Sequence, residues 1–167
     1  EPGPMERGII VHEALDRFQK AHPGDLPGDA LRRLLEIGRG VFDENLAHPG
    51  VEAFWWPRFE RVARWYVDYE RARRRAGFKT VGSEVLGELT INGTAGDFLL
   101  TARADRIDLD AATGLAIMDY KTGQAPSAKQ VETFFSPQLS LEAAIAANGG
   151  FDGVDAGPVA QLVYLEL

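Results

Sequence analysis

Apolar residues recur every three or four positions through the first half of the chain, which is the spacing of an amphipathic helix. This spacing predicts three helices, over residues 8–20, 29–46 and 51–76. Proline and glycine pairs after residue 22 and after residue 48 are expected to end the first two. Gly38 and Gly40 weaken the prediction for the middle of the second helix. One face of the third is expected to carry Trp55, Phe59, Val62, Tyr66 and Tyr69.

From residue 80 the apolar period shortens to two and β-branched residues become frequent, which is typical of strands. Strands are expected over residues 81–91, 97–109 and 115–121, and turn signals between them predict an antiparallel meander.

The C-terminal part adds a short helix from Ser127 to Phe135, a helix over 138–147 that Ser136 and Pro137 would start, and a last strand over 159–167. The predicted fold class is therefore α/β (α+β), with a mainly helical part over 1–79 and a sheet with helical cover over 80–167.

Length, net charge and cysteine count exclude several classes of protein. A chain of 167 residues and 18.3 kDa predicts a single domain over 1–167. A net charge of −7 excludes a histone-like polyanion binder. The absence of cysteine excludes disulfides, thiolate zinc sites and thiol nucleophiles.

The apolar runs are far shorter than the roughly 20 residues that span a bilayer, and the N-terminus lacks the basic start of a signal peptide. We therefore expect a cytoplasmic protein with no membrane contact. The chain lacks an initiator methionine and ends within a predicted strand, so we expect a fragment of a longer polypeptide.

Three charged residues lie near the ends of two adjacent predicted strands: Asp105, Asp119 and Lys121. Because side chains alternate along a strand, Asp119 and Lys121 share a face, and a hairpin brings Asp105 close to them. We expect Asp119 to be exposed at its strand end. Converging carboxylates favour a bound Mg²⁺, and a nearby lysine suits phosphodiester hydrolysis. The alternative is an ordinary surface ion pair.

Four segments occur in an order that is similar to a known family: Gly8 to His12, Asp105 to Asp108, Ile117 to Gly123, and Pro137 to Leu139. In this they resemble the RecB-like branch of the PD-(D/E)XK nucleases, and more narrowly the C-terminal nuclease module of AddB-type helicase–nuclease subunits. The resemblance implies a restriction-endonuclease-like core with a mixed central sheet.

The resemblance also implies roles for individual residues. Asp105 and Asp119 would bind Mg²⁺ or Mn²⁺ together with the main-chain carbonyl of Tyr120, and Lys121 would serve the attacking water. The family histidine near the metal corresponds to His12, and the glutamine that holds the lysine and the DNA backbone corresponds to Gln138. Glu84 is a possible additional carboxylate. In the plainer interpretation, His12 is a partly buried polar residue and Gln138 serves a helix cap.

Two features depart from the family pattern. Where RecB-like members have tyrosine four residues after the glutamine, this chain has Glu142. Many AddB-type proteins hold an iron–sulfur cluster with cysteines, so here the cluster is absent or its ligands lie outside this chain.

The third predicted helix is basic. Between Arg58 and Lys79 the chain has eight of its 18 positive charges against three acidic residues. Together with Trp65, this helix could form a surface for single-stranded DNA, whose candidate residues are Arg71, Arg73, Arg74 and Arg75. The alternative is a packing helix with solvated arginines.

The sequence and the resemblance therefore predict a Mg²⁺-dependent deoxyribonuclease, an exonuclease that cleaves the single strands emerging from a helicase during double-strand-break repair. The expected partners are DNA and an AddA-like helicase–nuclease subunit, in a bacterial cytoplasm. The chief rival is a catalytically silent DNA-binding or scaffold domain of the same fold. A metal-free carboxylate-pair hydrolase acting on sugars ranks last, because it gives Lys121 no role.

Overall fold

The computed structural model describes residues 3–45, 49–94, 96–127, 129–130 and 137–167. The chain divides into two compact units, Glu1–Gly77 with Leu167 and Phe78–Glu166. The single domain over residues 1–167 stays a prediction.

The first unit is helical, as the apolar spacing predicts. It contains α1 (Pro4–Ala21), α2 (Ala30–Asn45) and α3 (Pro49–Arg75). α2 ends before Pro49, as predicted, and Pro49 itself begins α3, two residues before the predicted start. A first helical turn tolerates proline, since its backbone N–H groups have no partner within the helix.

The buried stripe of α3 differs in part from the predicted one. Val62 and Tyr69 are only partly buried, and the residues that follow them, Ala63 and Glu70, are buried instead. A helix of 3.6 residues per turn can bury two adjacent residues where it packs closely. The buried stripe consists of Trp55, Phe59, Ala63, Tyr66, Val67 and Glu70.

Gly38 of α2 is needed by packing, although glycine weakens a helix. Gly38 is buried, and a Cβ atom added there would lie 2.1 Å from Cε1 of Phe59 on α3. At Gly40, half a turn further on, such a Cβ would have no described atom within 4 Å apart from its chain neighbours and the backbone of its own helix. The two glycines therefore have opposite effects on stability.

We expect Gly38→Ala to lower the free energy of unfolding by about 1–3 kcal/mol, because the added methyl group overpacks the α2–α3 contact. Its matched control, Gly40→Ala, should raise the same quantity by about 0.5–1 kcal/mol through helix propensity. Urea denaturation followed by circular dichroism measures both. A stabilised Gly38→Ala variant would show that the Phe59 ring moves aside freely.

The second unit contains a four-stranded sheet in the order β1-β2-β3-β4. β1 (Lys79–Ile91), β2 (Phe98–Asp110) and β3 (Gly114–Lys121) form the predicted antiparallel meander, and β4 (Val159–Glu166) pairs parallel to β3. The prediction of an α/β class with a mixed sheet is confirmed.

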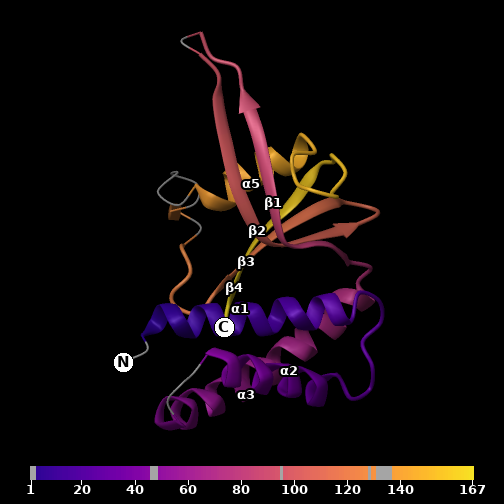
Figure 1. The fold of residues 1–167 in the computed structure, drawn as a ribbon. Helices are drawn as coiled ribbons and strands as arrows, with labels where there is room; N and C mark the ends of the chain where they lie inside the picture. Colours follow the sequence, from indigo (N-terminus) through magenta and orange to yellow (C-terminus); the bar gives the residue numbers. More distant parts are fainter. Residues whose placement is uncertain (1–2, 46–48, 95, 128, 131–136) are drawn as a thin grey trace. The chain divides into compact units, whose positions relative to one another are not determined.

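The β1–β2 hairpin extends well past the rest of the sheet (Figure 1). β1 pairs with β2 out to Ile91 and Phe98, whereas β3 pairs with β2 only from Arg106 to Asp110. The pairing of β2 with β3 therefore stops at Arg106, and Asp105 is the first residue of β2 outside it. A site can form at this point, because the main chain of β3 is no longer paired with the main chain of β2.

α5 (Gln138–Ala147) packs on the sheet within the second unit. Its buried residues Leu139, Ile145 and Ala146 join a core of sheet and loop residues: Ala104, Ile107, Leu115, Ile117, Phe151 and Val154. This packing fixes the N-terminus of α5 relative to the end of β3.

Two predictions at the start of α5 fall partly outside the described residues. The helix expected over 127–135 lies mostly there, and so does Ser136. Pro137 is the N-cap residue of α5 and not its first helical residue, and it supplies no side-chain cap.

Within the described ranges, no helix is both long enough and apolar enough to cross a membrane.

Candidate active site

Asp105 lies where the β2–β3 ladder ends. The last main-chain pair of that ladder is Arg106 with Met118, so the N–H of Tyr120 is no longer used by β2. Oδ2 of Asp105 accepts this N–H at 2.8 Å. The aspartate side chain thus replaces a strand neighbour and is held at the end of β3.

Asp119 is buried, with 3% of its surface exposed, so the expectation of an exposed carboxylate is wrong. Its Oδ1 accepts a hydrogen bond from Nε2 of Gln138 at 2.6 Å, because α5 covers this strand end. Its Oδ2 lies 2.6 Å from Nζ of Lys121 in an ion pair.

The electrostatic surroundings of Asp119 oppose its ionisation on balance. Burial raises the pKa of Asp119, the negative charge of Asp105 raises it further, and Lys121 and Gln138 act in the opposite direction. A cation bound here would reverse this balance, because it favours the charged carboxylates.

Gln138 links three charged side chains at the first turn of α5. Its Oε1 accepts a hydrogen bond from Nζ of Lys121 at 3.2 Å. Its Nε2 donates to Asp119, and also to Oε1 of Glu142 at 3.2 Å. Asp119, Lys121 and Gln138 thus form one hydrogen-bonded cluster, in which the family resemblance implied the contact between Gln138 and Lys121.

Glu142 departs from the family pattern in the sequence, but its place in this cluster is not predicted there. The available signal is its spacing, since residues four apart lie on the same helical face. Burial and the charges of Asp119 and Asp105 raise the pKa of Glu142 to about 7, against a smaller opposing effect of the Gln138 hydrogen bond.

Glu84 lies on β1 beside Asp105. The pairs Ser83 with Arg106 and Val85 with Ala104 flank the two positions, and carboxylate oxygens of Glu84 and Asp105 lie within 4.8 Å of each other. Glu84 has a φ of 49°, a left-handed conformation that costs about 1–2 kcal/mol in a residue other than glycine. Such strain is often found at functional sites.

These residues fit a divalent metal ion. Glu84, Asp105 and Asp119 offer carboxylate oxygens, which are the ligands that Mg²⁺ and Mn²⁺ prefer. Oδ2 of Asp119 is buried, and its partner is the ammonium group of Lys121 at 2.6 Å. A buried carboxylate oxygen that already attracts a positive charge, close to the charge of Asp105, is well suited to hold a cation.

Two further ligands are predicted, the main-chain carbonyl of Tyr120 and the imidazole of His12. Tyr120 has a buried side chain and its amide binds Asp105, so its carbonyl role stays a prediction. His12 lies on α1 in the helical unit and is half-buried, and its role at the metal also stays a prediction.

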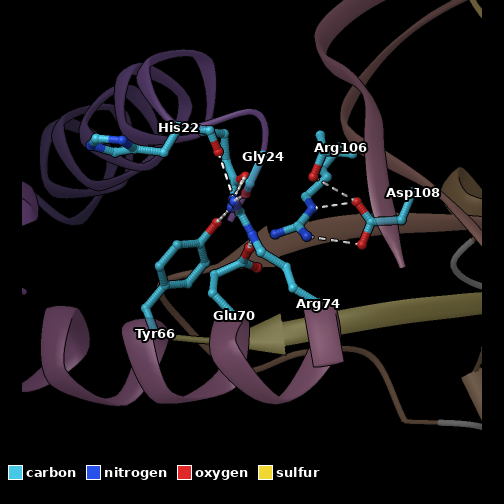
Figure 2. A network of polar contacts seen from close by, with 9 residues as sticks. His22, Gly24, Tyr66, Glu70, Arg74, Arg106 and Asp108 are labelled. Atoms are coloured by element: carbon cyan, nitrogen blue, oxygen red, sulfur yellow. Dashed lines mark hydrogen bonds and ion pairs between the residues drawn. The ribbon is translucent and has the colours of Figure 1, made fainter. Parts of the chain in front are cut away.

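Two residues that follow Asp105 on β2, Arg106 and Asp108, form a buried ion pair. Arg106 and Asp108 are both buried, and their side chains form a two-pronged ion pair with N–O distances of 2.7 and 2.9 Å (Figure 2). Thr80 donates to the same carboxylate at 2.9 Å. Because side chains alternate along a strand, this ion pair lies on the face of β2 opposite Asp105. It therefore contributes to the structure and not to the candidate active site.

The basic end of α3 is partly occupied by contacts inside the helical unit. Arg74 binds buried Glu70 at 3.2 Å, the carbonyl of His22 at 2.7 Å and the carbonyl of Gly24 (Figure 2). Carbonyls at the end of α1 lack helical partners, and Arg74 satisfies them. This favours a packing role for Arg74 over the predicted DNA contact.

The other predicted DNA contacts on α3 stay predictions. Arg71 approaches the carbonyl of Gly28 at 3.3 Å. Trp65 is 45% exposed and stacks on Tyr69 with ring centroids 5.3 Å apart, so it offers an aromatic surface. The predicted set includes Arg73 and Arg75 as well.

Comparison with known proteins agrees with this geometry. The family model described as the PD-(D/E)XK nuclease superfamily matches residues 1–167. The chain is 26% identical to an uncharacterized protein of Rickettsia bellii over 152 residues, and 26% identical to one of Rickettsia conorii over 155. These matches cover 91% and 90% of this chain but only 18% of each relative, so the chain spans less than a fifth of their length.

Proposed function

The chain belongs to the PD-(D/E)XK nuclease superfamily, and from this premise we propose that it is a metal-dependent deoxyribonuclease that cuts single-stranded DNA. The observation that carries the proposal is the cluster of Asp119, Lys121 and Gln138 next to Asp105. Two carboxylates that converge beside a lysine suit phosphodiester hydrolysis better than they suit packing.

Each side chain has a distinct task in this proposal. Glu84, Asp105 and Asp119 would hold a Mg²⁺ or Mn²⁺ ion, with His12 and the Tyr120 carbonyl as further ligands. The ion would neutralise the negative charge that develops on the scissile phosphate. Lys121 places a positive charge and a proton donor beside that phosphate and orients the attacking water. Gln138 keeps Lys121 in place through its amide oxygen.

We extend the proposal to a RecB-like, AddB-type module that works with a helicase subunit in double-strand-break repair, in a bacterial cytoplasm where chromosomal DNA lies. The order of the motifs supports this branch. The greater length of the Rickettsia relatives leaves room for further domains.

A catalytically silent DNA-binding or scaffold domain is the second candidate function. Glu142 favours it, because a buried carboxylate stands at the position where RecB-like members have tyrosine. The intact set of Asp105, Asp119 and Lys121 favours the nuclease.

The test is cleavage of an end-labelled single-stranded oligonucleotide by the purified chain. We expect cutting with Mg²⁺ or Mn²⁺, no cutting with EDTA, and recovery when Mg²⁺ is added back in excess. Cutting that persists in EDTA would contradict metal dependence. Folded protein that binds the oligonucleotide but leaves it intact with either metal would favour the silent scaffold.

A further inference from the structure

Glu142 is a carboxylate that the proposed reaction does not use, yet it lies at the site. Its side chain is 2% exposed, and it follows Gln138 by one turn on the same face of α5. Oε1 of Glu142 accepts a hydrogen bond from Nε2 of Gln138 at 3.2 Å. Oε2 is buried and has no hydrogen-bond partner among the described residues.

The hydrogen bonds of the Gln138 amide depend on its orientation. An amide side chain can rotate by 180°, which exchanges its oxygen and its NH₂ group. Here two acceptors, Oδ1 of Asp119 at 2.6 Å and Oε1 of Glu142 at 3.2 Å, both face the NH₂ group. In the rotated state the amide oxygen would face these two carboxylates and Lys121 would lose its acceptor. Two carboxylates therefore fix the orientation more strongly than one.

We propose that Glu142 is a positioning residue that holds the Gln138 amide so that its oxygen anchors the ammonium group of Lys121. For its effect on catalysis this inference rests on the proposed nuclease function, whereas the orientation of Gln138 can be tested without it. The resulting chain of contacts runs from Glu142 through Gln138 to Lys121, which lies 2.6 Å from Asp119.

The effect of Glu142 on the stability of the folded state distinguishes a positioning role from a structural one. A buried carboxylate with one unpartnered oxygen destabilises the folded state, and its replacement by an apolar group of similar size is often neutral or stabilising. Burial raises the pKa of Glu142, and the charges of Asp119 and Asp105 raise it further and add to this cost. If Glu142 positions Gln138, its removal should impair catalysis without loss of stability.

The kinetic test compares Glu142→Leu and Glu142→Gln with the wild-type chain. In Glu142→Leu we expect kcat for Mg²⁺-dependent cleavage to fall about 10- to 100-fold, which is typical when a supporting hydrogen bond is lost. KM for the oligonucleotide should change less than about twofold, and Tm should stay the same or rise. Glu142→Gln keeps an acceptor oxygen for Gln138 and should retain kcat within about threefold of wild type.

Two kinetic outcomes would overturn the inference. One is an unchanged kcat in Glu142→Leu. The other is a fall in Tm that accompanies the loss of activity in both variants, because this would make Glu142 a structural residue.

A second measurement does not depend on activity. Nuclear magnetic resonance of the Gln138 side-chain NH₂ group, assigned by its absence in Gln138→Leu, reports its hydrogen bonds. We expect one NH₂ proton to shift upfield in Glu142→Leu and to stay near its wild-type position in Glu142→Gln. Unshifted signals in Glu142→Leu would overturn the positioning role. A shift in a chain that never cleaves DNA would support that role and refute the nuclease proposal alone.

Discussion

Replacement of Asp119 by asparagine is expected to reduce metal-dependent cleavage about a thousandfold or more while the chain stays folded. Asparagine has the same shape but presents no anionic oxygen to a cation, and a bound ion contributes several kcal/mol to this kind of reaction. Burial already raises the pKa of Asp119, so loss of the charge removes a desolvation cost. The substitution also removes the ion pair with partly exposed Lys121, which opposes this gain, so the Tm of Asp119→Asn should stay close to that of the wild type.

The assay is the oligonucleotide cleavage rate, together with calorimetric titration of Mn²⁺ and a thermal melt. Asp152→Asn is the matched control, because Asp152 is exposed and lies in the loop before β4. The control should cleave and bind Mn²⁺ as the wild type does. Full activity in Asp119→Asn would remove Asp119 from the metal site and with it the basis of the nuclease proposal.

The secondary structure and the strand order of the meander follow from the sequence because they depend on local periods and turns. The placement of Asp105, Asp119 and Lys121 follows too, since alternation along two joined strands decides it. The burial of Asp119 does not follow, because Gln138 covers it from 19 residues away in the chain. No local pattern specifies which helix closes a strand end.

Local sequence patterns also do not show which charged residues are buried. Arg71 to Arg75 form one basic cluster in the sequence, but the phase of α3 turns Arg74 toward buried Glu70 and the end of α1. Glu142 shows the converse case, in which a residue that breaks a family pattern takes up a contact with Gln138 inside the site. The four-residue spacing puts Glu142 and Gln138 on one helical face, but the burial of that face, like the contacts of Arg74, depends on tertiary packing.

Replacement of Lys121 by methionine is expected to separate catalysis from metal binding. Methionine keeps an unbranched apolar side chain but lacks the ammonium group, whose nitrogen lies 5.6 Å from the ring centroid of Tyr164. Loss of a proton donor or acceptor of this kind typically costs about 10²- to 10⁴-fold in rate. We expect kcat to fall within this range.

Affinity for Mn²⁺ should be preserved or increased in Lys121→Met, because the positive charge 2.6 Å from Oδ2 of Asp119 competes with a bound cation. Calorimetric titration and the cleavage rate measure the two effects separately. Lys79→Met, a change at an exposed lysine at the start of β1, is the matched control and should alter neither. If Lys121→Met loses both Mn²⁺ binding and cleavage, Lys121 supports the structure of the metal site and does not act on the phosphate.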